Sequence, residues 1–409
     1  MAASTGNTGP KEIQSAGSAR GNTLEVLLAF LKLGLTAFGG PIAHLGFFQR
    51  EIVQRREWIA EGAYGDLVAL CQFLPGPASS QVAIALGYLR AGIPGALAAG
   101  IGFALPSAIL MIGFGYGFSA INSQSGFLHG LKLAAAAVVA QALISMARRF
   151  CPDRVRLTLA AAAASVVLGF PTAWAQVLVI AAGALYGRIF LQEGEPSAKS
   201  TFIHRDLRAG WFARFNIALY FVLLALLAAL SNCFRNHWLQ LADAFYRSGA
   251  LVFGGGHVVL PLLQSATVAR GWLTRNAFMA GYGAAQAIPG PLFTFSAYLG
   301  TVIGPGWPAG VWCLFWIFLP SFFLLFGVLP YWDGLRQNSR AQAALRGANA
   351  VVVGILLAAF YNPVLTVSVD SPGAFILALA AYFVLEFWRC PPWLLVVLCG
   401  TTASILLRK

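Results

Sequence analysis

Long apolar blocks separated by short polar loops dominate the pattern of this chain. Most blocks approach 17–25 residues, the length at which an α-helix crosses a hydrocarbon core of roughly 30 Å. The period-two alternation of a membrane β-barrel is absent, so the blocks are predicted to be helices. The pattern predicts about 13 such segments, at residues 24–46, 62–90, 93–120, 130–147, 157–170, 172–191, 213–231, 239–264, 276–303, 307–330, 345–361, 372–388 and 391–407.

The pattern of the first six blocks returns in the second half of the chain. FGGP at Phe38–Pro41 is matched by FGGG at Phe253–Gly256, and QFLPGP at Gln72–Pro77 is matched by QAIPGP at Gln286–Pro291. The spacing is 214 residues (289 − 75, 320 − 106 and 352 − 138) at three matched pairs, Pro75 and Pro289, Pro106 and Pro320, and Val138 and Val352. A constant spacing over such a distance indicates a duplicated unit.

The basic loops predict that the two repeats cross the membrane in opposite directions. The apolar segment 131–147 is followed by a cluster of arginines, whereas its counterpart 345–361 is preceded by one. Basic loops are favoured on the cytoplasmic side, so equivalent helices have opposite orientations. We therefore predict an all-α polytopic membrane protein with two inverted-topology repeats, a cytoplasmic N-terminus and a periplasmic C-terminus.

This topology divides the chain into five parts. They are a disordered cytoplasmic tail at 1–22, an N-terminal repeat at 23–191, a cytoplasmic linker at 192–212, a topology-inverting span at 213–231 and a C-terminal repeat at 232–409. The unmatched span 213–231 is what an inversion requires, because it returns the chain to the opposite side before the second repeat. Inverted repeats are a common construction of secondary transporters, which suggests that the chain moves a small solute.

Composition supports a membrane protein and argues against several other classes. Hydrophobic residues make up 58% of the chain and charged residues only 10%, against roughly 25% in soluble domains. The net charge of +13 is accounted for mainly by short basic loops, so nucleic acid is not an expected partner. No nucleotide-binding loop, metal-ligand spacing or catalytic constellation is evident. We expect no enzyme activity, no cofactor and no metal, and energy drawn from an ion gradient or the membrane potential.

Each PGP motif interrupts an apolar block and predicts a broken or re-entrant helix. Two prolines two residues apart remove two N–H donors and forbid a continuous helix. The N-terminus of the following half-helix could bind an oxyanion, with a nearby hydroxyl as a further donor. The alternative is a pair of kinks that only shape the helix bundle. The candidate substrate-binding residues are Pro75, Gly76, Pro77, Ser79 and Ser80 in the first repeat and Pro289, Gly290, Pro291 and Thr294 in the second.

The FGG motifs and two cations complete the candidate binding set. Gly39, Gly40, Gly254 and Gly255 permit either close helix packing or an unwound segment that faces a PGP break. Lys32 and Arg247 are matched cations within apolar blocks. They could supply counter-charge to an anion, or they could extend to a membrane interface.

Three titratable residues are candidates for proton coupling. His44 and His257 each follow an FGG motif, and Asp66 precedes the first PGP motif. A histidine can change its charge near neutral pH. The alternatives are hydrogen-bonded core histidines and an interfacial carboxylate.

Four stretches of this chain resemble the chromate ion transporter family, over about residues 24–407, as in its long members with two homologous domains. They are FGGPIAHLGFFQREIVQRREWI, QFLPGPASSQVAIALGY, FGGGHVVLPLL and QAIPGPLFTFSAYLG. The resemblance implies a bacterial inner-membrane protein that exports chromate, is driven by the proton-motive force and confers chromate resistance. Gly256 stands where the first repeat has Pro41, so the two halves are not expected to contribute identical ligands.

Two alternatives remain open at this point. Sulfate or another tetrahedral oxyanion could be the substrate, because sulfate has the same charge and shape as chromate. A membrane scaffold or assembly protein is the alternative outside transport, although it would have no need of duplicated breaks with following hydroxyls. The chain could also form a homodimer.

Overall fold

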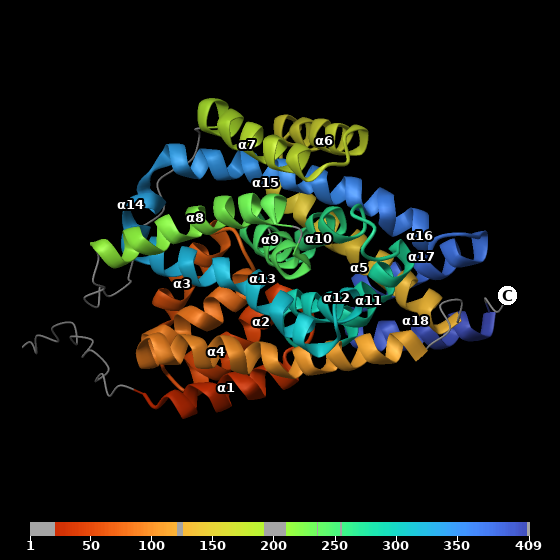
Figure 1. The fold of residues 1–409 in the computed structure, drawn as a ribbon, viewed down its shortest axis with the longest axis horizontal. Coiled ribbons are helices and arrows are strands. Elements are labelled where there is room, and N and C mark those ends of the chain that lie inside the picture. The colour runs from red at the N-terminus through yellow and green to blue at the C-terminus, as the bar shows by residue number, and fades with distance from the viewer. Residues whose placement is uncertain (1–20, 121–125, 192–209, 235, 254–255, 407–409) are drawn as a thin grey trace, which may run out of the picture.

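The computed structural model describes residues 21–120, 126–191, 210–234, 236–253 and 256–406, and within these ranges it contains helices and no β-strand. The long helices run along a common direction (Figure 1). The described chain begins at the left end of this bundle in Figure 1, and the C-terminal end lies at the right. The first and last described residues are therefore at opposite ends of the helix bundle.

The first half of the chain forms eight of these elements. They are α1 (Thr23–Thr36), α2 (Gly40–Phe48), the π-helical η1 (Gln49–Arg55), α3 (Glu61–Phe73), α4 (Ala78–Ala120), α5 (Gly126–Phe150), α6 (Arg154–Gly169) and α7 (Ala173–Phe190). Polar side chains start several of them, as Asn22, Asp153 and Thr172 accept hydrogen bonds from the first free N–H groups of α1, α6 and α7. Within α4, Ala91 and Gly92 leave helical geometry, which separates a half-helix at 78–90 from a long helix at 93–120.

The unmatched helix α8 (Trp211–Cys233) leads into the second half. That half contains α9 (His237–Ala250), η2 (Gly256–Val258), α10 (Val259–Thr267), α11 (Arg275–Ala287), η3 (Leu292–Thr294), α12 (Phe295–Ile303), α13 (Trp307–Val328), η4 (Leu329–Tyr331), α14 (Trp332–Gln337), α15 (Ser339–Ala359), η5 (Phe360–Leu365), α16 (Thr366–Ser368), α17 (Pro372–Glu386) and α18 (Pro392–Leu406).

Helices stop at both PGP motifs, as the two prolines predict. In the first half α3 ends at Phe73 and α4 begins at Ala78, and in the second α11 ends at Ala287 and η3 begins at Leu292. Gly76 and Gly290 have φ of +121° and +99°, a region that favours glycine because it has no Cβ. The predicted apolar blocks 62–90 and 276–303 are thus each built from two shorter helices.

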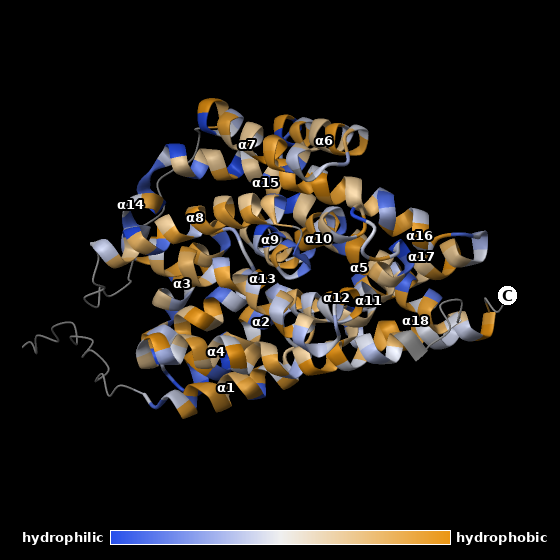
Figure 2. Cartoon of the chain, viewed as in Figure 1, coloured by the Kyte–Doolittle hydropathy of each residue, from blue (hydrophilic) through white to orange (hydrophobic). Residues whose placement is uncertain are grey.

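Five helical stretches are long and apolar enough to cross a membrane. They are Ala78–Phe118, Gly126–Phe150, Trp211–Cys233, Trp307–Gln337 and Ser339–Ser368. Shorter apolar helices cover Trp174–Phe190, Leu292–Ile303, Pro372–Glu386 and Pro392–Leu406. Hydrophobic residues extend along most of the bundle, and hydrophilic residues gather at α14 (Figure 2). The chain has the helix lengths and composition of a polytopic membrane protein.

The same helix crossing is built in both halves. A Cβ added to Gly34 of α1 would lie 2.7 Å from the carbonyl oxygen of Phe103 in α4. A Cβ added to Gly249 of α9 would lie 2.1 Å from the carbonyl oxygen of Ile317 in α13. Gly249 and Ile317 are the repeat counterparts of Gly34 and Phe103, so in both halves a glycine lets the helix backbones approach closely.

The two halves also interlock at their breaks. The Gly76 N–H donates to the Val252 carbonyl at 2.7 Å, and the Gly290 N–H donates to the Ala37 carbonyl at 3.0 Å. Ala37 and Val252 occupy equivalent positions, each directly before an FGG motif. Each PGP break therefore lies against the FGG break of the other repeat, near the middle of the molecule.

Candidate functional site

The described residues enclose a cavity of about 980 Å³ between the basic ends of α5 and α15 and the paired breaks. Its floor contains residues from the FGG and PGP segments of both halves, namely Gly39, Gly40, Pro41, Gly76, Ala78, Gly256, His257 and Gln286. Its rim contains five arginines, Arg148, Arg149, Arg156, Arg336 and Arg346. The cavity thus connects a cationic mouth with the point where the repeats interlock.

Positive charge dominates this lining, because Glu386 is the one carboxylate among the described lining residues. Three of the arginines have carboxylate partners, in the pairs Arg148 with Glu386 at 3.7 Å, Arg156 with Asp153 at 2.5 Å, and Arg336 with Asp66 at 2.8 Å. Arg149 and Arg346 have no carboxylate within salt-bridge distance in the part of the chain that the structure describes. Two guanidinium charges therefore remain available to an anion.

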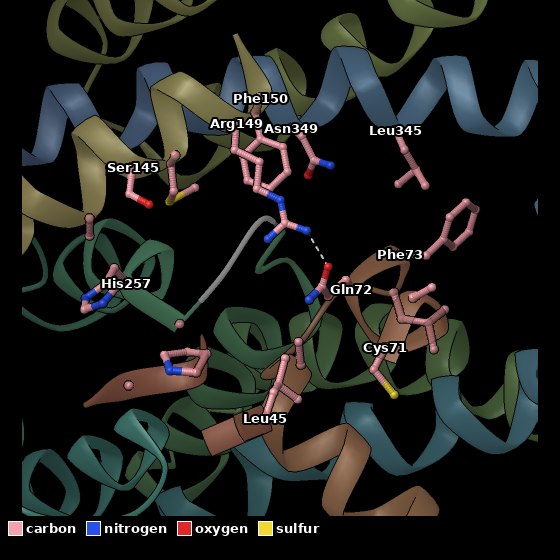
Figure 3. Close-up of a pocket in the computed structure, with 18 of the residues that line it drawn as sticks. Leu45, Cys71, Gln72, Phe73, Ser145, Arg149, Phe150, His257, Leu345 and Asn349 are labelled. Atoms are coloured by element: carbon pink, nitrogen blue, oxygen red, sulfur yellow. Dashed lines mark hydrogen bonds between the residues drawn. The ribbon is translucent and has the colours of Figure 1, made fainter. Parts of the chain in front are cut away.

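These two arginines make hydrogen bonds to neutral oxygens. Nη2 of Arg149, in the last turn of α5, donates to Oε1 of Gln72 at 2.5 Å, and Figure 3 shows this bond crossing the cavity. Nε and Nη2 of Arg346 donate to the Leu191 carbonyl at 3.2 and 2.7 Å. Arg156 is near enough to Arg346 for their charges to repel, so a bound anion would relieve an unfavourable arrangement.

Two glutamines at equivalent positions line the same cavity. Gln72 and Gln286 each lie three residues before the first proline of a PGP motif. The Nε2 atom of Gln286 is buried and has no hydrogen-bond partner among the described residues. Both glutamines belong to the duplicated motif, but neither is among the predicted substrate-binding residues. Their recurrence beside a predicted binding break was the signal that could have identified them.

Of the predicted substrate-binding residues, the glycines lie nearest to the cavity. Gly39, Gly40 and Gly76 line it, whereas Pro41 lies in the first turn of α2 and Pro75 and Pro77 lie between α3 and α4. Gly254 and Gly255 lie outside the described residues.

The predicted hydroxyls are buried behind the cavity wall. Ser79 Oγ lies 3.3 Å from Nδ1 of His44, and Thr294 Oγ1 donates to the Pro291 carbonyl at 2.8 Å. Ser80 Oγ is buried with no partner in the described part of the chain. The N–H groups of Gly76 and Gly290 are already bonded across the repeats. The backbone donors left for an anion are those that follow the break, beginning at Ala78.

The two predicted cations do not line the cavity. Lys32 Nζ lies 3.1 Å from Oε2 of Glu51, and the guanidinium of Arg247 is bonded to the carboxylate of Asp243. Each of these cations is thus paired with a carboxylate of its own half. The cations at the cavity are arginines of loops and helix ends, whose clusters also predict the topology.

The three proton-coupling candidates have different surroundings. Nδ1 of His257 lies 2.8 Å from the hydroxyl of Tyr282, and His257 lines the cavity. His44 is 1% exposed and packs edge-on against Phe103. Asp66 is paired with Arg336 and joins α3 to α14. Only His257 of the three combines a titratable side chain with direct contact to the cavity.

The sequence of this chain matches a known protein family in both halves. The sequence model of the Chromate transporter family matches residues 24–188 and again 239–404. The chain is 28% identical to a chromate transport protein of Pseudomonas aeruginosa, over 81% of this chain and 79% of the relative. It is 27% identical to a chromate transport protein of Cupriavidus metallidurans, over 89% of this chain and 88% of the relative. No solved structure matches it. The double match spans most of both halves, and the chain belongs to the chromate transporter family.

Proposed function

We propose that this chain is a secondary transporter that exports chromate across the bacterial inner membrane and thereby confers chromate resistance. The observation that carries the proposal is the cavity with a cationic rim that ends at the paired helix breaks. Family membership and relatives named as chromate transport proteins support chromate as the substrate. Sulfate, with the same charge and shape, is the competing substrate.

The placement of the basic residues supports an inverted-topology repeat. Arg149 lies at the C-terminal end of α5, whereas Arg346 lies near the N-terminal end of α15, its repeat counterpart. Both line the same cavity. If basic segments stay in the cytoplasm, α5 and α15 cross in opposite directions and the cavity opens to the cytoplasm. The N-terminus is then cytoplasmic and the C-terminus periplasmic.

Export follows from these elements in three steps. The arginine rim draws the dianion from the cytoplasm, since unpaired guanidinium groups offset part of its desolvation cost. The anion then reaches the floor, where Gly39, Gly40 and Gly76 allow the backbone to approach it closely. The repeats exchange conformations about their interlocked breaks, which closes the cytoplasmic mouth and opens the opposite side.

His257 is the proposed site of proton coupling. It is the histidine at the cavity floor, and its hydrogen bond to Tyr282 holds one ring nitrogen in place. Protonation on the periplasmic side would bring a proton inward as chromate leaves. Under this proposal His257→Gln uncouples flux from the proton gradient but leaves chromate binding intact.

Flux in everted membrane vesicles tests the function. Labelled chromate should accumulate in vesicles that contain the chain, should require a proton gradient, and should fall when sulfate is added in excess. Equal accumulation with and without the chain would refute chromate transport. Accumulation of sulfate alone would favour the sulfate alternative, and transport of neither anion would favour a scaffold.

A further inference from the structure

The geometry points to an oxyanion-exchange site at Arg149, where an incoming tetrahedral dianion replaces the side-chain carbonyl of Gln72 as the acceptor of the guanidinium. This inference rests on the proposed function, and it names the residues at which substrate capture begins. It assigns Gln72 the role of an internal competitor, not of a ligand.

The environment of Arg149 differs from that of its neighbour. Both Arg148 and Arg149 lie at the C-terminus of α5, where a cation is favoured by the helix dipole alone. Arg148 is satisfied by Glu386 at 3.7 Å. Arg149 instead extends across the cavity, and its hydrogen bond goes to a neutral amide. A guanidinium carries five N–H donors in a planar fork, so one bond to Gln72 leaves donors free for a ligand.

The neutrality of Gln72 is what makes exchange favourable. A carboxylate at this position would form an ion pair that an incoming anion would have to break. The bond from the guanidinium to the Gln72 amide has one ionised partner, whereas a bond to a dianion has two ionised partners and can be bidentate, which adds Coulombic attraction. A dianion therefore competes well against the amide oxygen for Arg149. The unpartnered Nε2 of Gln286 and the unpaired charge of Arg346 line the same cavity and provide further attraction for the captured anion.

The position of Gln72 connects capture to the centre of the molecule. Gln72 lies one residue before the end of α3, which leads directly into the first PGP break. Gly76 in that break is bonded to Val252 of the other repeat. When the anion takes the guanidinium, the end of α3 loses its hydrogen bond to α5. Binding of the anion thus removes a hydrogen bond between α5 and the segment at which the repeats interlock.

Isothermal titration calorimetry on the purified full-length protein in detergent tests this site, with chromate and sulfate as the probes. Arg149→Gln should weaken binding about 10- to 100-fold, as expected for loss of one charged hydrogen-bonding group. Gln72→Glu should weaken it comparably, because it supplies a permanent internal carboxylate. Gln72→Ala should tighten binding by about 2- to 10-fold, because the competitor is gone. Arg154→Gln removes a charge at the start of α6, five residues after Arg149, without lining the cavity, and this variant should bind like the unchanged protein.

The two Gln72 variants are expected to change the affinity for the dianion in opposite directions, which distinguishes a competitor from a ligand. If Gln72→Ala weakens binding as Gln72→Glu does, Gln72 is a ligand and the exchange site is wrong. Unchanged binding in Arg149→Gln, or no binding of either dianion to the unaltered protein, also overturns it. Gel-filtration profiles show whether each variant is folded, and Gln72→Glu retains every arginine. Binding that behaves as expected without gradient-driven flux in vesicles would refute export while leaving the site intact.

Discussion

A Gly290→Ala substitution tests the interlocking of the two repeats most directly. Gly290 has φ of +99°, and its N–H donates to the Ala37 carbonyl of the other half. A Cβ at this position would lie 2.8 Å from Oγ of Ser107, in α4 of the first repeat. The added methyl group would therefore meet strain from its own backbone and a clash from the opposite repeat.

The two contributions can be given magnitudes. A left-handed backbone conformation costs a residue with a Cβ about 1–2 kcal/mol. Overpacking a close contact costs about 1–3 kcal/mol. We expect Gly290→Ala to lower the free energy of unfolding by about 2–5 kcal/mol in total. Ser107→Ala should restore about 1–2 kcal/mol of this loss, because it removes the hydroxyl that the new methyl group meets.

The assay is a double-mutant cycle, measured by unfolding in mixed detergent and SDS micelles with intrinsic fluorescence as the signal. Gly40→Ala is the matched control, because its φ is +78° and a Cβ there would meet nothing within 4 Å. Gly40→Ala should lower the free energy of unfolding only by the backbone contribution of about 1–2 kcal/mol. Additivity of Gly290→Ala and Ser107→Ala within about 0.5 kcal/mol would refute the contact between the repeats.

Two further predictions concern the face that we propose to be cytoplasmic. Burial raises the pKa of Glu51, in η1, but hydrogen bonds from Arg56, Lys32 and Arg55 outweigh burial and lower the pKa to about 2. Glu51→Gln should lower the free energy of unfolding by only about 1–2 kcal/mol, because Lys32 and Arg55 are half-exposed and solvent screens their charges. This loss of stability should be full above pH 4.5 and should disappear toward pH 2. A loss that does not change with pH in thermal unfolding would contradict this pairing. Reporter fusions at Phe150 and Asn338 should both report the cytoplasm, and a periplasmic signal at either would contradict the inversion.

Local chemistry made the helix breaks predictable. Proline removes an N–H donor wherever it occurs, so two PGP motifs in apolar blocks ended helices regardless of the surroundings. The duplication of the PGP motif then indicated that the two helix breaks have the same role. The structure adds what no local rule contains, namely that each break is bonded to the FGG segment of the opposite repeat.

The roles of the charged residues were less predictable, because the role of a charged side chain depends on which residue it pairs with. Lys32 looked like counter-charge in a membrane, but Glu51 lies 19 residues away in sequence and 3.1 Å away in space. Arg149 looked like a topology signal, because nothing in the sequence shows that the end of α5 faces Gln72. The partner of a charged side chain depends on tertiary packing, which the sequence alone does not show.

The repeats match in their scaffold but differ in the charges at their ends, and this asymmetry predicts that a dianion is released more readily at the outer side. Under an offset of 214 residues, Arg148 and Arg149 correspond to Asn362 and Pro363. An outward-facing mouth built from the equivalent elements would lack both cations, so a dianion captured by the arginines would be held less tightly on the outer side. Asn362 lines a smaller cavity of about 240 Å³. Asn362→Arg should therefore retain chromate at the exit and lower flux in everted vesicles, by about tenfold if the cation strengthens binding there by about 1.4 kcal/mol. Asn362→Gln adds no charge and should transport normally. Equal flux in both variants would mean that the missing cations do not govern release of the anion.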